Sequence, residues 1–154
     1  MKRLMSSKRL PSLFGLRMTT EGSDVMETGM KIFTVEEANA LLPTVRNILA
    51  KIQRAHKRIF TYRHDAKKAA EGAEQGGGGM LQGLQYAKIL MDLTSQTGEL
   101  EALGVQLKDF DRGLVDFPSL RDGRVVLLCW QIGEGDELEW WHDVEAGFAG
   151  RSRL

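Results

Sequence analysis

Three side chains in the C-terminal third of the chain have the chemistry of a catalytic or metal-binding centre. Asp116, Cys129 and His142 combine a carboxylate, the only thiol of the chain and an imidazole. An aspartate can orient an imidazole, and a histidine beside a cysteine can generate a thiolate nucleophile. With Glu134, the same side chains also offer the oxygen, sulfur and nitrogen ligands that zinc binds. The alternative is a structural set: a small buried thiol, an aspartate that accepts turn N–H groups and a histidine with satisfied hydrogen bonds.

No short motif decides between these alternatives. CxxC, HExxH and GxSxG are absent, and neither GEG nor GFAG precedes a helix with a lysine, so no specific motif implies a cofactor. Arg151 is a candidate for binding a carboxylate or phosphate. The candidate ligand-binding residues are Asp116, Trp130, Glu134, Trp141, His142 and Arg151. The candidate metal ligands are Asp116, Cys129, Glu134 and His142.

The spacing of apolar residues after Leu107 predicts the strands that bring these side chains together. Asp122-Gly123 is a strong signal for a tight hairpin turn. We therefore predict a small three-stranded antiparallel β-meander over 113–143. Its middle strand is apolar on both faces and should be covered, whereas Pro118 suits an edge strand. The strands are predicted at 113–120, 124–132 and 137–143, with turns at 122–123 and 133–136.

These turns also predict the register of the meander. Asp116 should face Cys129, Cys129 should face Trp140, and Leu127 should face His142. One face of the sheet then carries Asp116, Cys129, Trp140 and His142, and the other carries Phe117, Leu128, Trp130 and Trp141.

The first half of the domain has the pattern of a long antiparallel helical hairpin, at 34–104. Thr34 and Glu37 form a capping box, with Phe33 at the staple position. Pro43 predicts that a short first helix ends there and a second begins. Apolar residues then recur at a 3-4 spacing over 45–73 and 86–103, as in a packed hairpin or coiled coil.

The details of the hairpin follow from single residues. The glycines at 76–79 predict a flexible connecting loop. Gln96 interrupts the apolar stripe, and we expect it to fix the helix register. Gly104 predicts a C-terminal cap. His56 and His64 lie off the stripe, and we expect both to be solvated.

Composition indicates one α+β domain over 31–154. The chain has 154 residues, 42% apolar and 27% charged, without net charge. We expect no membrane segment and no nucleic-acid binding, although 43–73 is basic and 92–145 acidic; we expect these halves to neutralise each other. One cysteine excludes an internal disulfide, which favours a reducing cytoplasm. Residues 1–30 read as a disordered or mis-assigned extension.

Residues 31–154 resemble a bacterial domain-of-unknown-function family, the one numbered twenty-two-oh-three. FTVEEANALLP, LKDFDRGLVDFPS, VVLLCWQIGE and WWHDVEAGFAGR carry this resemblance. The family is uncharacterised, so the resemblance implies no activity. It does imply that a shared function lies at the sheet end, where the family's recurrent positions correspond to Gly113, Leu114, Asp116, Phe117, Pro118, Cys129, Trp130, Gly133, Glu134, Trp141, His142, Gly147 and Arg151.

Two functions are consistent with the sequence. The absence of a specific catalytic motif favours a non-enzymatic module that binds a protein or a small ligand, with the helical hairpin as the surface for a second copy or another protein. The alternative is an enzyme or metal-binding protein whose site lies at the sheet end, around Asp116, Glu134, His142 and Arg151.

Overall fold

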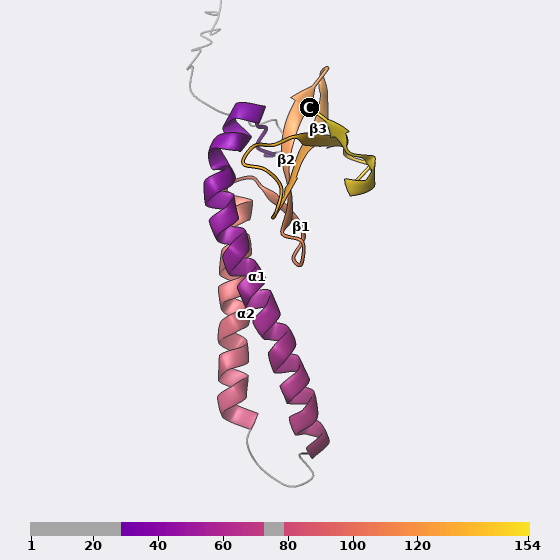
Figure 1. Cartoon of the computed structure of the whole chain (residues 1–154). Helices are drawn as coiled ribbons and strands as arrows, with labels where there is room; N and C mark the ends of the chain where they lie inside the picture. Colours follow the sequence, from indigo (N-terminus) through magenta and orange to yellow (C-terminus); the bar gives the residue numbers. More distant parts are fainter. Residues whose placement is uncertain (1–28, 73–78) are drawn as a thin grey trace, which may run out of the picture.

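The computed structural model describes residues 29–72 and 79–154 (Figure 1). The predicted extension 1–30, apart from its last two residues, and most of the predicted loop 76–79 lie outside the described residues. The described residues form an α+β fold of two long helices, a short 3-10 helix and five strands, as the sequence predicts at the level of fold class. The elements are α1 (Val35–Gly72), α2 (Gly79–Ala102), β1 (Gln106–Asp109), β2 (Leu114–Arg121), β3 (Arg124–Gln131), β4 (Trp140–Asp143), η2 (Phe148–Gly150) and β5 (Ser152–Arg153).

Pro43 does not divide the first helical segment, so the predicted break there is wrong. Helix α1 runs through it without interruption. A proline inside a helix costs roughly 3 kcal/mol, because it removes one N–H and crowds the preceding turn. Pro43 lies on the exposed side of α1, whereas Leu42 and Val45 are fully buried against the core. Packing on the buried side therefore keeps the helix continuous.

The helix ends follow the sequence signals closely. The Glu37 N–H donates to Thr34 Oγ1 at 3.1 Å, and the Thr34 N–H donates to Glu37 Oε2 at 2.9 Å, which confirms the capping box. At the end of α2, Gly104 has a φ of +84°. Its N–H donates to the Glu101 carbonyl, and the Val105 N–H donates to the Leu100 carbonyl. This pattern is a Schellman cap, and it turns the chain into β1.

The sheet has the strand order β1-β2-β3-β4-β5, all antiparallel, so the predicted number of three strands is too small. Strands β2 and β3 lie close to their predicted positions, whereas β4 is shorter than the predicted strand 137–143. Strand β2 is not an edge strand over its whole length. Strand β1 pairs only with Leu114, Val115 and Asp116. Beyond that point the Pro118 carbonyl accepts a hydrogen bond from the Phe33 N–H at 2.8 Å. Pro118 therefore lies where no ladder N–H is needed.

The two faces of the sheet have different surroundings. The N-terminal half of α1 packs on the face that carries Val115, Phe117, Leu128 and Trp130, and these residues form the main core. The edge of the Phe117 ring contacts Phe33, with 5.5 Å between the ring centroids. The opposite face carries Cys129, and Arg151 in the chain's last segment reaches this side chain, with 3.9 Å between Arg151 Nη1 and Cys129 Sγ. Strand β3 is buried on both faces from Val126 to Trp130, as its apolar sequence predicts.

Beyond the sheet, α1 and α2 continue as a helix pair (Figure 1). Its core is thin, with Ala55, Ile59 and Ile89 buried in this part of the pair. Gln96 lies in the stripe between the helices, and its Oε1 is buried without a hydrogen-bond partner. No helix in the described ranges is both long and apolar enough to cross a membrane.

The basic and acidic halves of the chain meet at two places. Arg46 forms an ion pair with Asp136 and lies over the Trp130 ring. His56 Nδ1 lies 3.1 Å from Asp111 Oδ1, and its ring stacks on Phe110. The expectation that His56 is solvated is therefore wrong, because the loop after β1 covers it. His64 is exposed, as expected.

Candidate metal centre

The three central strands place Asp116, Cys129 and His142 together on one face of the sheet. Asp116 lies opposite Cys129 in the β2–β3 ladder, and His142 lies opposite Leu127 in the β3–β4 ladder, which confirms the predicted register. Because direct and diagonal neighbours on one face are close, the three side chains converge. Asp116 is 2% exposed, Cys129 0% and His142 3%. A carboxyl, a thiol and an imidazole are thus buried in one small space.

The hydrogen bonds of His142 fix the direction in which its free electron pair points. Its Nδ1 lies 2.8 Å from the Asp143 carbonyl oxygen, which can only accept, so Nδ1 carries a proton. Its Nε2 lies 3.4 Å from Asp116 Oδ1. In the neutral ring, Nε2 therefore presents its electron pair to Asp116. A proton or another cation must lie between these two atoms, because two electron pairs would otherwise face each other.

Cys129 is held as a thiol. Burial and, to a smaller extent, the nearby Asp116 carboxylate raise its pKa from 9.0 to about 12, although Arg151 opposes both effects. A thiol with this pKa is a poor nucleophile near neutral pH. The arrangement also differs from a catalytic triad, in which the aspartate contacts one imidazole nitrogen and the nucleophile the other. In this centre Nε2 faces Asp116 and Nδ1 faces the Asp143 carbonyl, so neither imidazole nitrogen is paired with the thiol.

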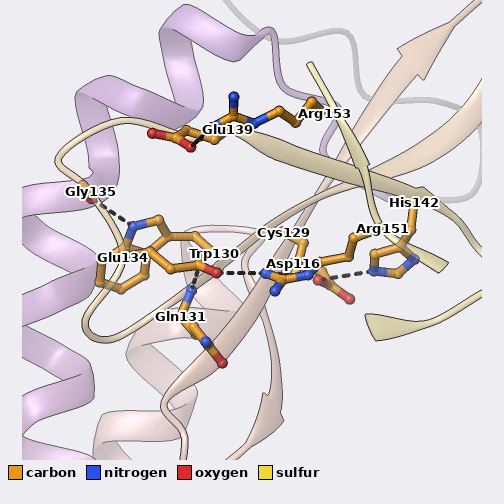
Figure 2. Close-up of polar contacts among 10 residues, drawn as sticks. All are labelled: Asp116, Cys129, Trp130, Gln131, Glu134, Gly135, Glu139, His142, Arg151 and Arg153. Atoms are coloured by element: carbon orange, nitrogen blue, oxygen red, sulfur yellow. Dashed lines mark hydrogen bonds and ion pairs between the residues drawn. The ribbon is translucent and has the colours of Figure 1, made fainter. Parts of the chain in front are cut away.

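Arg151 and Glu134 form a clamp beside this centre (Figure 2). Arg151 Nη1 donates to Glu134 Oε1 at 2.7 Å and lies 3.9 Å from Cys129 Sγ. The guanidinium stacks on Phe148, 3.7 Å from the ring centroid, and on Trp140, at 5.1 Å. Figure 2 shows the guanidinium between Glu134 and the Asp116–His142 pair. Arg151 therefore fastens the last segment of the chain over Cys129.

Glu134 is separated from the three converging side chains by the Arg151 guanidinium (Figure 2). Its second oxygen, Oε2, accepts the Gln131 N–H at 3.0 Å, so both oxygens already have donors. The sequence predicts Glu134 as a further metal ligand, but the ligand atoms that the structure brings within 4.8 Å of one another come from Asp116, Cys129 and His142.

The two candidate tryptophans lie apart from the other ligand-binding candidates. Trp130 is buried in the core on the helix-facing side, and its indole N–H donates to the Gly135 carbonyl at 3.0 Å. Trp141 packs against the same core, and its indole N–H donates to the Arg153 carbonyl at 3.2 Å. The structure therefore brings Asp116, Glu134, His142 and Arg151 to one side of the sheet and leaves these tryptophans on the other.

Sequence reasoning missed two groups near the centre. Lys108 Nζ lies 3.8 Å from Asp116 Oδ2, because β1 pairs with β2 next to Asp116. Phe148 supports Arg151 from the 3-10 helix η2. Strand β1 is short and polar and gave no periodic signal. The stacking of Arg151 on Phe148 was indicated in the sequence only by an aromatic residue three positions before the arginine.

The distances suit a metal ion after small side-chain rotations. Zinc bonds of about 2.0–2.3 Å separate the ligands of a tetrahedron by roughly 3.3–3.8 Å. The ligand atoms of Asp116, Cys129 and His142 all lie within 4.8 Å of one another. The backbone carbonyl that holds His142 Nδ1 is also the usual outer partner of a metal-binding histidine. Oxygen, sulfur and nitrogen donors are therefore oriented toward a common point.

A hollow also lies elsewhere on the molecule. It has a volume of about 480 Å³ and is bounded by residues near Lys31, by the end of α2 near Glu101 and by Leu107 of β1. Its lining includes a lysine and a glutamate but neither a cysteine nor a histidine. Among the described residues, the metal-type ligands converge on the opposite side of the sheet from the core, not in this hollow.

Comparison with known proteins adds a family but no activity. No curated protein and no solved structure matches the chain. One family model matches residues 31–154, which include every element described above, and the family is described as an uncharacterized conserved protein. The chain therefore belongs to the DUF2203 family.

Proposed function

We propose that this protein is a metal-binding module that holds a zinc-like divalent ion with Asp116, Cys129 and His142. The observation that carries the proposal is the direction of the His142 ring. Its Nδ1–H is committed to the Asp143 carbonyl, so its Nε2 electron pair points toward Asp116 Oδ1 at 3.4 Å. A divalent cation at this point would bind the imidazole nitrogen, the carboxylate and the Cys129 sulfur, and the thiol proton would be released to solvent on binding.

The donor set favours zinc over harder cations. Calcium and magnesium take mainly oxygen ligands, whereas zinc accepts thiolate, imidazole and carboxylate in one tetrahedron. Three protein ligands leave one position for water or a small ligand. Copper(II) would bind the same donors more tightly, so availability of the metal decides which ion is held in the cell. A reducing cytoplasm is the compartment we propose, because the single thiol must stay reduced to bind.

Nearby positive charges oppose a cation at this point but do not exclude it. Arg151 is neutralised by Glu134 at 2.7 Å. Lys108 lies 3.8 Å from Asp116 Oδ2, but its side chain is 40% exposed, so water screens its charge.

The enzymatic alternative has less support. A thiol with a pKa of about 12 does not supply a ready nucleophile, and Arg151 would have to leave Glu134 before it could bind a substrate anion. The arrangement supports binding rather than thiol-based catalysis. The module we propose is therefore non-enzymatic, with a metal ion as its small ligand.

The experiment is a metal-binding measurement on the full chain. The protein is purified without a polyhistidine tag, treated with chelator, dialysed against zinc and analysed for bound metal and for a competitive dissociation constant. We expect one zinc per chain. The conservative variants Asp116→Asn, Cys129→Ser and His142→Gln should each weaken binding by about ten- to a hundredfold or more, since each removes one ligand.

The matched control is His64→Gln, which removes an exposed histidine of α1. This variant should bind zinc as the unmodified protein does. Binding that His64→Gln abolishes, or that survives all three centre variants, would show that the metal sits elsewhere. Absence of stoichiometric binding of any divalent ion would leave the buried group as a proton-sharing pair of His142 and Asp116, and the proposal would be wrong.

A further inference from the structure

The side of α2 that faces away from α1 carries two large apolar residues in contact with water. Leu84 is 69% exposed and Met91 is 72% exposed, the highest values for large apolar side chains among the described residues. They lie seven positions apart, which is two helical turns, so both point to the same side. Large apolar side chains that share one exposed side of a helix are a feature of interaction sites.

These two residues belong to a second 3-4 repeat along α2. The repeat, which we call the outer seam, consists of Leu84, Ala87, Met91, Thr94 and Gly98, all exposed. At 100° per residue it lies on the other side of the helix from the buried Ile89 and Leu100. The Thr94 hydroxyl donates to the Leu90 carbonyl at 2.9 Å, so it does not require a partner outside the helix. A sustained 3-4 repeat is the pattern by which one helix packs on another.

Charge distribution selects the partner of the outer seam. Between Gly79 and Gly98, α2 has Lys88 and Asp92 as its only charged residues. The exposed side of α1 is strongly basic, with Arg54, Lys57, Arg58 and Arg63 all exposed. Two copies of α1 would repel each other, whereas two copies of α2 would not. We infer that the outer seam binds the α2 helix of a second copy of this chain, forming a symmetric dimer.

The sizes of the seam residues favour antiparallel pairing about Met91. In this arrangement Leu84 of one copy lies opposite Gly98 of the other, so a large side chain meets the position with the least bulk. A Cβ added at Gly98 would contact nothing within 4 Å in the single chain. Lys88 comes within about one turn of Asp92 of the other copy, which pairs opposite charges. Parallel pairing would instead place Leu84 on Leu84 and Gly98 on Gly98, leaving a gap.

The test is the mass of the full chain in solution, measured by sedimentation equilibrium over a range of concentrations. We expect a dimer for the unmodified protein. The double variant Leu84→Glu with Met91→Glu should weaken dimerisation by about a hundredfold or more, because it places charges in the contact. The matched control is Phe60→Glu, which alters a 58% exposed residue of α1 and should leave the dimer intact. A monomeric unmodified protein, or a dimer that the double variant leaves intact, would overturn the inference.

Cross-linking tests the direction of the helices. Under mild oxidation Met91→Cys should form a covalent dimer with itself. A mixture of Leu84→Cys and Gly98→Cys should cross-link, whereas Leu84→Cys alone should not. Self-cross-linking of Leu84→Cys with no product from the mixture would contradict antiparallel pairing. Zinc binding by the Leu84→Glu, Met91→Glu variant should be unchanged, so this test and the metal test fail independently.

Discussion

The two ends of this molecule reverse the usual distribution of polar and apolar residues in opposite ways. On the outer sheet face, an ionisable trio of Asp116, Cys129 and His142 is buried almost completely. On α2, Leu84 and Met91 are left in water. A buried charge costs free energy unless it is paired, and exposed apolar surface costs free energy unless it is covered. These two features motivate the two proposals, a cation bound by the trio and a second copy of α2 on the outer seam.

The comparison also separates these residues from ordinary packing. The face of the sheet that meets α1 is filled by Phe117, Leu128 and Trp130. Burial of their apolar area stabilises the fold and accounts for their position. Burial of apolar area does not account for the polar trio on the other face. Substitutions in the trio should therefore cost more stability than substitutions of nearby exposed polar groups.

The largest effect is expected when one member of the buried trio loses its charge partner. Asp116→Ala should lower the free energy of unfolding by about 3–5 kcal/mol, because it leaves His142 Nε2 buried without a partner. Asp143→Ala is the control. Its carboxylate is 46% exposed and pairs with the exposed Arg124, so the loss should be about 1 kcal/mol or less. Urea denaturation in chelator measures both, and equal losses would show that the trio has no special place.

The next effect concerns the thiol. Cys129 should react with a thiol reagent about a thousandfold more slowly in the folded protein than in urea, because it is fully buried. Its raised pKa also predicts a pH dependence. Between pH 9.0 and about 12 the unfolded chain loses the thiol proton while the folded chain keeps it, so stability falls as the pH rises through this range.

The control for this pH dependence is Cys129→Ser, which lacks the titrating thiol. In chelator, the free energy of unfolding of the unmodified protein should fall relative to that of this variant as the pH rises above 9.0. A difference that stays constant with pH, together with rapid labelling of the folded protein, would mean that Cys129 is accessible.

A smaller effect is expected at the clamp. Arg151→Ala should lower the free energy of unfolding by about 1–3 kcal/mol and speed the labelling of Cys129, because its guanidinium is 15% exposed, bonded to Glu134 and stacked on Phe148. Arg153→Ala is the control, since Arg153 is 72% exposed and should matter by about 1 kcal/mol or less. Equal labelling rates in the two variants would contradict the role of Arg151 in covering the thiol.

The smallest effect lies in the helix pair. Gln96 Oε1 is buried without a partner between α1 and α2. Gln96→Leu should therefore raise the free energy of unfolding by about 1 kcal/mol. Thermal denaturation of this variant and of Gln85→Leu, where Gln85 accepts a hydrogen bond from the Tyr62 hydroxyl, gives the contrast. Destabilisation by Gln96→Leu would favour the register-fixing role that the sequence suggests.

Short-range signals were sufficient to predict the trio. Asp122 and Gly123 both have positive φ, as a tight two-residue turn requires, and this turn alone sets Asp116 opposite Cys129. The connection from β3 to β4 spans 132–139 and is longer than the predicted turn at 133–136, but Leu127 lies opposite His142 as predicted. Because side chains alternate along strands, the faces of all these residues follow from the two turns.

Features that depend on distant packing were not predictable. Helix α1 continues through Pro43 because residues on both sides of it are buried against the sheet, and a local propensity contains no such information. Strands β1 and β5 are four and two residues long, too short to show a period. The clamp of Arg151 on Glu134 depends on a turn at Gly147, with a φ of +62°, and on η2, which positions the arginine.

The most direct test of the metal centre is the absorption spectrum of the full chain loaded with cobalt(II) in place of zinc. Tetrahedral coordination by Asp116, Cys129 and His142 predicts intense visible bands and a thiolate-to-cobalt charge-transfer band in the near ultraviolet, and the latter should vanish in Cys129→Ser. A spectrum like that of cobalt in water, or a charge-transfer band that persists in Cys129→Ser, would contradict a centre built on this thiol.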